Sequence, residues 1–168
     1  MTKKVAYCAM LTALAMIFGY VEALIPFGFG IPGIKLGIAN IVIVLALYMF
    51  PAYQVFMIQL ARIVLVSFLF GNMSMMIYSL AGGILSFLVM LLLKKTKEFS
   101  VTGVSIAGGV SHNIGQLAVA VLVVQNIRIA FYLPVLMASG LLTGCLIGML
   151  ANKIKPVLGS VENEKGKV

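Results

Sequence analysis

Residues 52–93 read AYQVFMIQLARIVLVSFLFGNMSMMIYSLAGGILSFLVMLLL, and this stretch decides the fold. Arg62 is its only charged side chain, and Gly71 and Asn72 divide it into two apolar runs. Each run has about the 20 apolar residues that a helix needs to cross the hydrocarbon core of a bilayer. The pattern therefore predicts two membrane-spanning helices, over residues 52–70 and 73–93, joined by a tight turn.

The rest of the chain has the same composition. Apolar residues make up 62% and charged residues 10% of its 168 residues, whereas a soluble domain carries about 25% charged residues. The mean hydropathy is +1.17. These values exclude a disordered or ordinary soluble protein and predict an all-α integral membrane bundle. The length leaves room for about six spans and for no separate soluble catalytic domain.

We expect one six-helix transmembrane domain over residues 1–152 and a polar cytoplasmic tail over residues 153–168. A loop rich in glycine and proline separates the first span from the second, and Pro51 separates the second from the third. Neither segment can continue a helix. A charged connection separates the fourth span from the fifth. The expected spans cover residues 5–25, 34–50, 52–70, 73–93, 100–124 and 131–151.

The lysines predict the orientation in the membrane. With six spans, nine lysines share the side of both termini, and only Lys35 and Arg128 lie opposite. Because basic residues concentrate in cytoplasmic loops, both termini are predicted to be cytoplasmic. The lysines behind the net charge of +8 are then expected to orient the helices in the membrane and to contact anionic lipid headgroups. They do not indicate nucleic-acid binding. The nine are Lys3, Lys4, Lys94, Lys95, Lys97, Lys153, Lys155, Lys165 and Lys167.

Arg62 is the first candidate binding residue, because a cation in the middle of a span costs at least about 2.5 kcal/mol. Gln59 lies one turn away on the same face. One interpretation is a structural arginine, paired with helix-end carbonyls or with Glu22. The other is a cation that faces a cavity and receives a polar or anionic group of a ligand.

The fifth span carries His112, Asn113 and Gln116 near its midpoint. Side chains this polar must point into the protein or a wet cavity, and His112 and Gln116 share a helix face. They are predicted to bind substrate, although Asn and Gln also serve only to bridge helices. A single His without acidic or Cys neighbours predicts no metal site.

The outer ends of the first two spans add further candidates. Glu22 closes the first span, and Lys35 with Asn40 opens the second. Lys35 and Asn40 are predicted to contact substrate. The apolar loop between these spans is either a movable lid or a segment that lies in the membrane interface.

Small residues recur at four-residue spacing on three spans, a pattern typical of close helix contacts. Ala9 and Ala13 form such a pair on the first span. On the fifth and sixth spans we expect the small residues to pack against each other or against a neighbouring span. They are Gly103, Ala107, Ser111 and Gly115 on the fifth, and Gly140, Gly144 and Gly148 on the sixth.

The sequence lacks the residues that several classes of enzyme need for catalysis. The chain contains no Asp, so no aspartate-rich motif binds a magnesium diphosphate, and it has no GxxxxGK[ST] loop for ATP. No arrangement of Ser, His and an acid indicates hydrolysis. We therefore predict no catalytic residues, no metal and no cofactor.

Four segments resemble the bacterial Gx transporter family, also labelled heptaprenyl diphosphate synthase component I. They are Lys35-Leu-Gly-Ile-Ala-Asn40, the setting of Arg62, Ser79-Leu-Ala-Gly-Gly83 and Gly109-Val-Ser-His-Asn-Ile-Gly-Gln116. The six spans, the Ala9–Ala13 pair and the outer loop also resemble the substrate-binding S components of energy-coupling factor transporters. The resemblance covers about residues 5–152.

This resemblance implies a small-molecule-binding subunit of the bacterial plasma membrane that docks on a transmembrane T subunit and paired cytoplasmic ATPases. Ala9 and Ala13 match the docking motif of S components, and the usual ligand position points to His112, Asn113 and Gln116. The synthase label implies an alternative. Because the chain lacks Asp, it would then be a non-catalytic membrane partner of a prenyl diphosphate synthase, with isoprenoids or quinones as plausible ligands.

Overall fold

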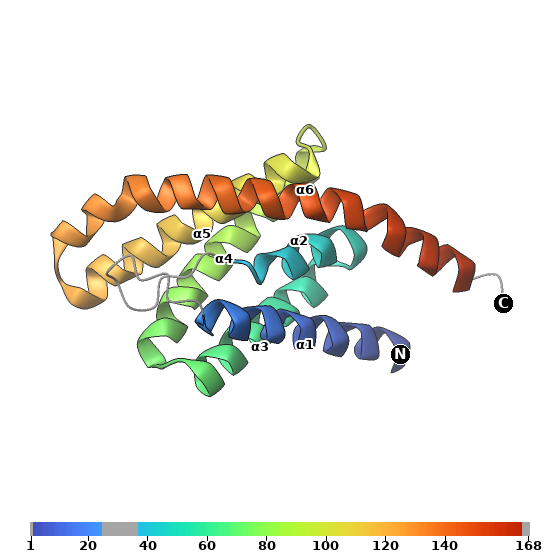
Figure 1. The fold of residues 1–168 in the computed structure, drawn as a ribbon, viewed down its shortest axis with the longest axis horizontal. Helices are drawn as coiled ribbons and strands as arrows, with labels where there is room; N and C mark the ends of the chain where they lie inside the picture. The colour runs from blue at the N-terminus through green and yellow to red at the C-terminus, as the bar shows by residue number, and fades with distance from the viewer. Residues whose placement is uncertain (1, 25–36, 166–168) are drawn as a thin grey trace.

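The computed structural model describes residues 2–24 and 37–165, which form six α-helices and one short 3-10 helix. The predicted all-α class is confirmed. Helix α1 begins and α6 ends at the same end of the bundle (Figure 1). The elements are α1 (Thr2–Leu24), α2 (Asn40–Met49), α3 (Ala52–Phe70), α4 (Met73–Thr96), α5 (Val101–Val124), η1 (Ile127–Tyr132) and α6 (Leu133–Lys165).

Short polar residues set several helix ends. Helix α3 begins after Pro51 without a side-chain cap. At the start of α4, the Asn72 side chain accepts a hydrogen bond from the Met75 amide at 2.9 Å and so caps the helix. Ser100 caps α5 in the same way through the Gly103 amide at 3.1 Å. These side chains satisfy backbone donors that have no partner inside the first turn of a helix. The tight turn predicted at Gly71 and Asn72 is therefore confirmed.

Four helical segments of the described chain are long and apolar enough to cross a membrane, at Ala52–Phe70, Met73–Thr96, Val101–Val124 and Ile127–Pro156. They indicate a membrane protein. The other two apolar helices are shorter, since their described apolar parts cover Ala6–Glu22 and Asn40–Met49. The six expected spans thus correspond to four full-length candidates and two shorter helices.

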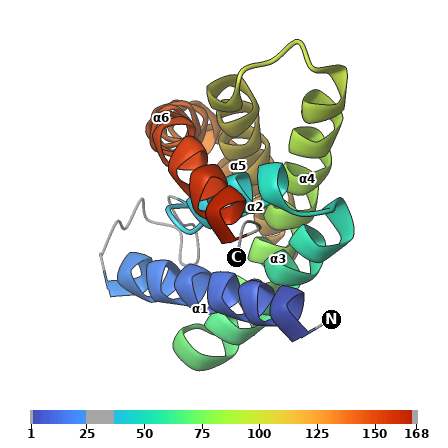
Figure 2. The same cartoon turned by 90° about the vertical axis from the view of Figure 1, so that its right-hand side faces the viewer.

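Helix α2 differs most from its expected span at residues 34–50. It begins at Asn40, after Gly37 with a backbone φ of 82° that favours glycine. At about 1.5 Å per residue it is about 15 Å long, half of a bilayer core. All side chains from Asn40 to Leu47 are buried, and α2 lies among the other helices (Figure 2). Residues 26–33, the expected loop, and 34–36 lie outside the described residues.

Helix α6 is longer than its expected span at residues 131–151. A 3-10 helix forms the first part of that segment, and α6 then continues through Pro156 to Lys165. Residues 153–165, expected to form a polar tail outside the bundle, are therefore helical. Their polarity predicted a position outside the hydrocarbon but did not predict where the helix ends.

The small residues of α6 pack against α5, as predicted. A Cβ atom on Gly140 would lie 2.9 Å from the Gly109 carbonyl oxygen, and one on Gly144 would lie 2.7 Å from Ile106 Cα. Gly115 of α5 packs against Gly82 of α4, which is the other arrangement that was predicted, contact with a neighbouring span. Helix α4 consequently packs between α3 and α5, and α6 covers the other side of α5.

Candidate functional site

Arg62 lies in the middle of α3 and is only 7% exposed. Its Nη2 atom donates hydrogen bonds to Asn40 Oδ1 at 3.2 Å and to Gln59 Oε1 at 2.9 Å. Both acceptors are neutral amides, so they orient the guanidinium without neutralising it. Arg62 Nε is buried and has no hydrogen-bond partner among the described residues. Arg62 therefore keeps a free donor for another group, and Glu22 is the acid whose charge acts on its guanidinium.

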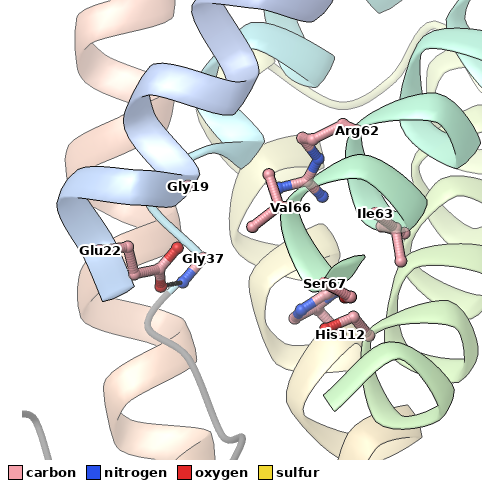
Figure 3. Close-up of a pocket in the computed structure, with 9 residues that line it drawn as sticks. Gly19, Glu22, Gly37, Arg62, Ile63, Val66, Ser67 and His112 are labelled. Carbon is pink, nitrogen blue, oxygen red and sulfur yellow. Dashed lines mark hydrogen bonds between the residues drawn. The ribbon is translucent and has the colours of Figure 1, made fainter. Parts of the chain in front are cut away.

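Arg62 lines a pocket that also receives side chains from α1, α4 and α5 (Figure 3). The empty space is about 370 Å³ including its opening, and the closed part has room for little more than a water molecule. The pocket in this conformation therefore fits one small polar group. Its lining residues are Gly19, Glu22, Gly37, Arg62, Ile63, Val66, Ser67, Ser79 and His112.

Helix α1 closes one side of this pocket. The Glu22 carboxylate accepts a hydrogen bond from the Gly37 amide, which fastens the end of α1 to the segment before α2. One turn earlier, a Cβ atom on Gly19 would lie 3.0 Å from Val66 Cγ2. Because α1 packs this closely on α3, a ligand larger than one polar group requires α1 and α3 to separate at Val66.

The pair Gly82–Gly83 brings α4 close to both neighbouring helices. A Cβ atom on Gly82 would lie 2.7 Å from Gln116 Cγ on α5, and one on Gly83 would lie 2.8 Å from Gln59 Nε2 on α3. Both glutamines are fully buried. Within the described chain, Gln116 Oε1 and Nε2 and Gln59 Nε2 have no hydrogen-bond partner. Each such atom costs about 1–3 kcal/mol, so this polar layer retains unused hydrogen-bonding capacity.

Residues 11–154 match the protein family described as heptaprenyl diphosphate synthase component I. The chain belongs to this family. The match extends from α1 into α6 and thus includes every residue that lines the pocket. No curated protein and no solved structure matches the chain.

In this member of the component I family, three of the predicted site residues lie together. Arg62 and His112 line the same pocket, and Asn40 binds the Arg62 guanidinium. They come from α3, α5 and the first residue of α2. Lys35 lies outside the described residues. The structural interpretation of Arg62 named helix-end carbonyls or Glu22 as its partners. In the described chain its hydrogen bonds go to side-chain amides and not to such carbonyls, whereas Glu22 does act on its charge.

The other two predicted residues point elsewhere. Asn113 Nδ2 donates to the Leu136 carbonyl oxygen at 2.7 Å and to Ser139 Oγ at 3.3 Å, and so joins α5 to α6. Gln116 is buried against Gly82 and does not line the pocket. Asn113 thus has the bridging arrangement that was the alternative to substrate contact.

Three polar residues of the pocket, Glu22, Ser67 and Ser79, were not among the predicted binding residues. Glu22 was considered as a partner of Arg62 but was not counted among the binding residues. Ser67 and Ser79 carried little signal, since serine is common in membrane helices and bonds to its own backbone. With these groups, the pocket combines one cation, one acid, two hydroxyls and an imidazole, which suits it to hold a polar or anionic group.

Proposed function

We propose that this protein is a substrate-binding membrane subunit that captures a small molecule from outside the cell and helps to import it. Arg62 carries this proposal. Arg62 is a buried cation whose hydrogen bonds go to neutral amides, whose Nε donor is unused among the described residues, and on whose charge one acid, Glu22, acts. A cation at this depth is costly, and its unused donor favours a further polar partner. A ligand with an anionic or strongly polar head would offset that cost.

The size of the pocket limits how the ligand binds. Only its polar head fits beside Arg62 in the present conformation, so the remainder lies toward the apolar interface of α1 and α3. An amphipathic anion suits such a site, since ligand pockets combine apolar walls with a few placed polar groups. Binding then requires α1 to move, and movement of this kind is part of the proposed transport cycle.

We further propose six spans in the bacterial plasma membrane with both termini in the cytoplasm. In support, α1 begins and α6 ends at the same end of the bundle (Figure 1), and the start of α5 packs beside the second half of α6, where a Cβ atom on Gly148 would lie 2.6 Å from Thr102 Cα. Lysines gather near these ends, as expected for cytoplasmic ends: Lys3 and Lys4 at the start of α1, Lys94, Lys95 and Lys97 just before α5, and Lys153, Lys155 and Lys165 in the last part of α6. Within the described residues, helix α2 contributes about half of the second crossing.

A ligand screen tests the binding function. The purified full-length protein is heated in detergent with vitamins, flavins, quinones and prenyl phosphates. A true ligand at 100 times its dissociation constant should add about 2.7 kcal/mol to the free energy of unfolding, which raises the melting temperature. If none of these four classes changes the melting temperature, the binding proposal fails.

A second candidate function rests on the family match. Its description names one component of a synthase, which favours a non-catalytic membrane subunit that works with a separate prenyl diphosphate synthase. With no Asp in the chain, the magnesium-binding carboxylates for that chemistry must come from the partner. An isoprenoid with a phosphate head would suit the Arg62 pocket in either role.

Affinity purification from native membranes separates the two candidates. We expect a T subunit and cytoplasmic ATPases to copurify, driven by α1, where Ala9 and Ala13 are both exposed. Ala9→Leu with Ala13→Leu should remove these partners, because bulky side chains prevent close helix contact. Ala118→Leu, at an exposed alanine of α5, is the matched control and should retain them. Recovery of a soluble prenyl diphosphate synthase instead would support the second candidate and contradict docking through α1.

A further inference from the structure

Two lysines meet at the end of α2 that lies away from Arg62. The Lys94 ammonium on α4 donates a hydrogen bond to the Leu47 carbonyl oxygen, and it lies 5.3 Å from the centroid of the Tyr48 ring. The Lys155 ammonium on α6 lies 4.6 Å from the same centroid. Three helices that are distant in sequence thus place two cations around one aromatic ring.

This arrangement has more positive charge than its described neighbours neutralise. The Leu47 carbonyl and the tyrosine ring attract the ammonium groups, but neither carries a full negative charge. The acids among the described side chains are Glu22 and Glu98, and neither forms an ion pair with Lys94 or Lys155. Two like charges held this close favour an anion between them.

The lysines also lie at the depth of lipid headgroups. At about 1.5 Å per residue, Lys94 is about 32 Å along α4 from Met73, and Lys155 is about 33 Å along α6 from Leu133. The hydrocarbon core of a bilayer is about 30 Å thick. Lys155 is exposed, and Tyr48 and Lys94 are partly exposed, so a group at the membrane surface reaches all three.

We propose that Lys94, Lys155 and Tyr48 form a binding site for a phosphate group at the end of α2. The two ammonium groups supply charge and hydrogen-bond donors, and the Tyr48 ring holds them in position. The phosphate belongs either to an anionic lipid headgroup or to a soluble phosphate compound. The site is separate from the Arg62 pocket and does not depend on the function proposed for it.

Native mass spectrometry of the full-length protein in detergent tests the site, in one arm with phosphatidylglycerol and in the other with inorganic diphosphate. Each lysine near a membrane surface contributes about 1 kcal/mol, so Lys155→Gln and Lys94→Gln should each weaken binding about fivefold. Lys153→Gln and Lys95→Gln make the same charge change at exposed positions of the same helices and should leave binding unchanged.

The two arms identify the source of the phosphate. Loss of phosphatidylglycerol binding assigns the site to lipid, and loss of diphosphate binding assigns it to a soluble ligand. Because Lys94 also caps α2, Lys94→Gln can prevent folding, and Lys155→Gln then carries the test alone. Equal weakening by Lys155→Gln and Lys153→Gln, or no binding in either arm, overturns the proposal.

Discussion

Arg62→Met should reduce the ligand-dependent rise in melting temperature to about half or less while the unliganded protein remains folded. A hydrogen bond to a charged group contributes about 1.5–3 kcal/mol, so its loss weakens binding about 10-fold to 150-fold. The unliganded protein tolerates the change because the removed desolvation cost of a buried cation offsets the acceptors left unpaired on Asn40 and Gln59. Melting curves of both proteins, with and without the compound found by the screen, measure the two effects separately.

Two further variants define the role of Arg62. Arg128→Gln removes an exposed arginine of η1 and should leave the thermal shift unchanged. Arg62→Lys keeps a cation but loses the planar donor group, so it should retain only part of the shift. If Arg62→Met unfolds the unliganded protein, or if it retains the full shift, Arg62 is a structural residue and the binding role is wrong.

Gly144→Ala should lower the free energy of unfolding by about 1–3 kcal/mol, the usual cost of overpacking a close contact. The added Cβ atom would lie 2.7 Å from Ile106 Cα and 2.9 Å from the Ser105 carbonyl oxygen. These are backbone atoms, so relief requires α5 and α6 to move apart. Unfolding in mixed micelles of increasing SDS content measures the loss.

Gly103→Ala is the matched control, because it makes the same change on α5 where the nearest atom, Ser100 Oγ, lies at an ordinary 3.5 Å. It should be neutral or stabilise the helix by up to about 1 kcal/mol, since alanine has the better helix propensity. Equal effects of Gly144→Ala and Gly103→Ala would contradict the close contact between α5 and α6.

The long helices could be predicted from the sequence because apolar runs and their breaks determine them locally. The bounds of α3 agree with the expected span, and Asn72 caps α4 where a turn was expected. The extent of α2 could not be predicted this way. Its apolar run gives no sign of where the helix begins, because a fully buried helix has no polar face to mark it.

The site was predictable in its residues but not in its geometry. Arg62 and His112 were identified because polar groups at mid-span must point inward. The residue after His112, Asn113, faces α6 instead, since consecutive residues on a helix point about 100° apart. Only the packing of α5 between α4 and α6 decides which of the two reaches the pocket. The bond between Arg62 and Asn40 likewise depends on the depth of α2.

The burial of α2 has a consequence for how the protein is made. A helix of about 15 Å is too short to be held in the membrane by lipid alone, and its buried side chains pack against α6, which comes much later in the chain. Its last turn is bonded to Lys94, 47 positions after Leu47. During synthesis, α2 therefore has no complete site to occupy until the C-terminal helix leaves the ribosome. The position of α2 in the membrane therefore depends on helices that follow it in the chain.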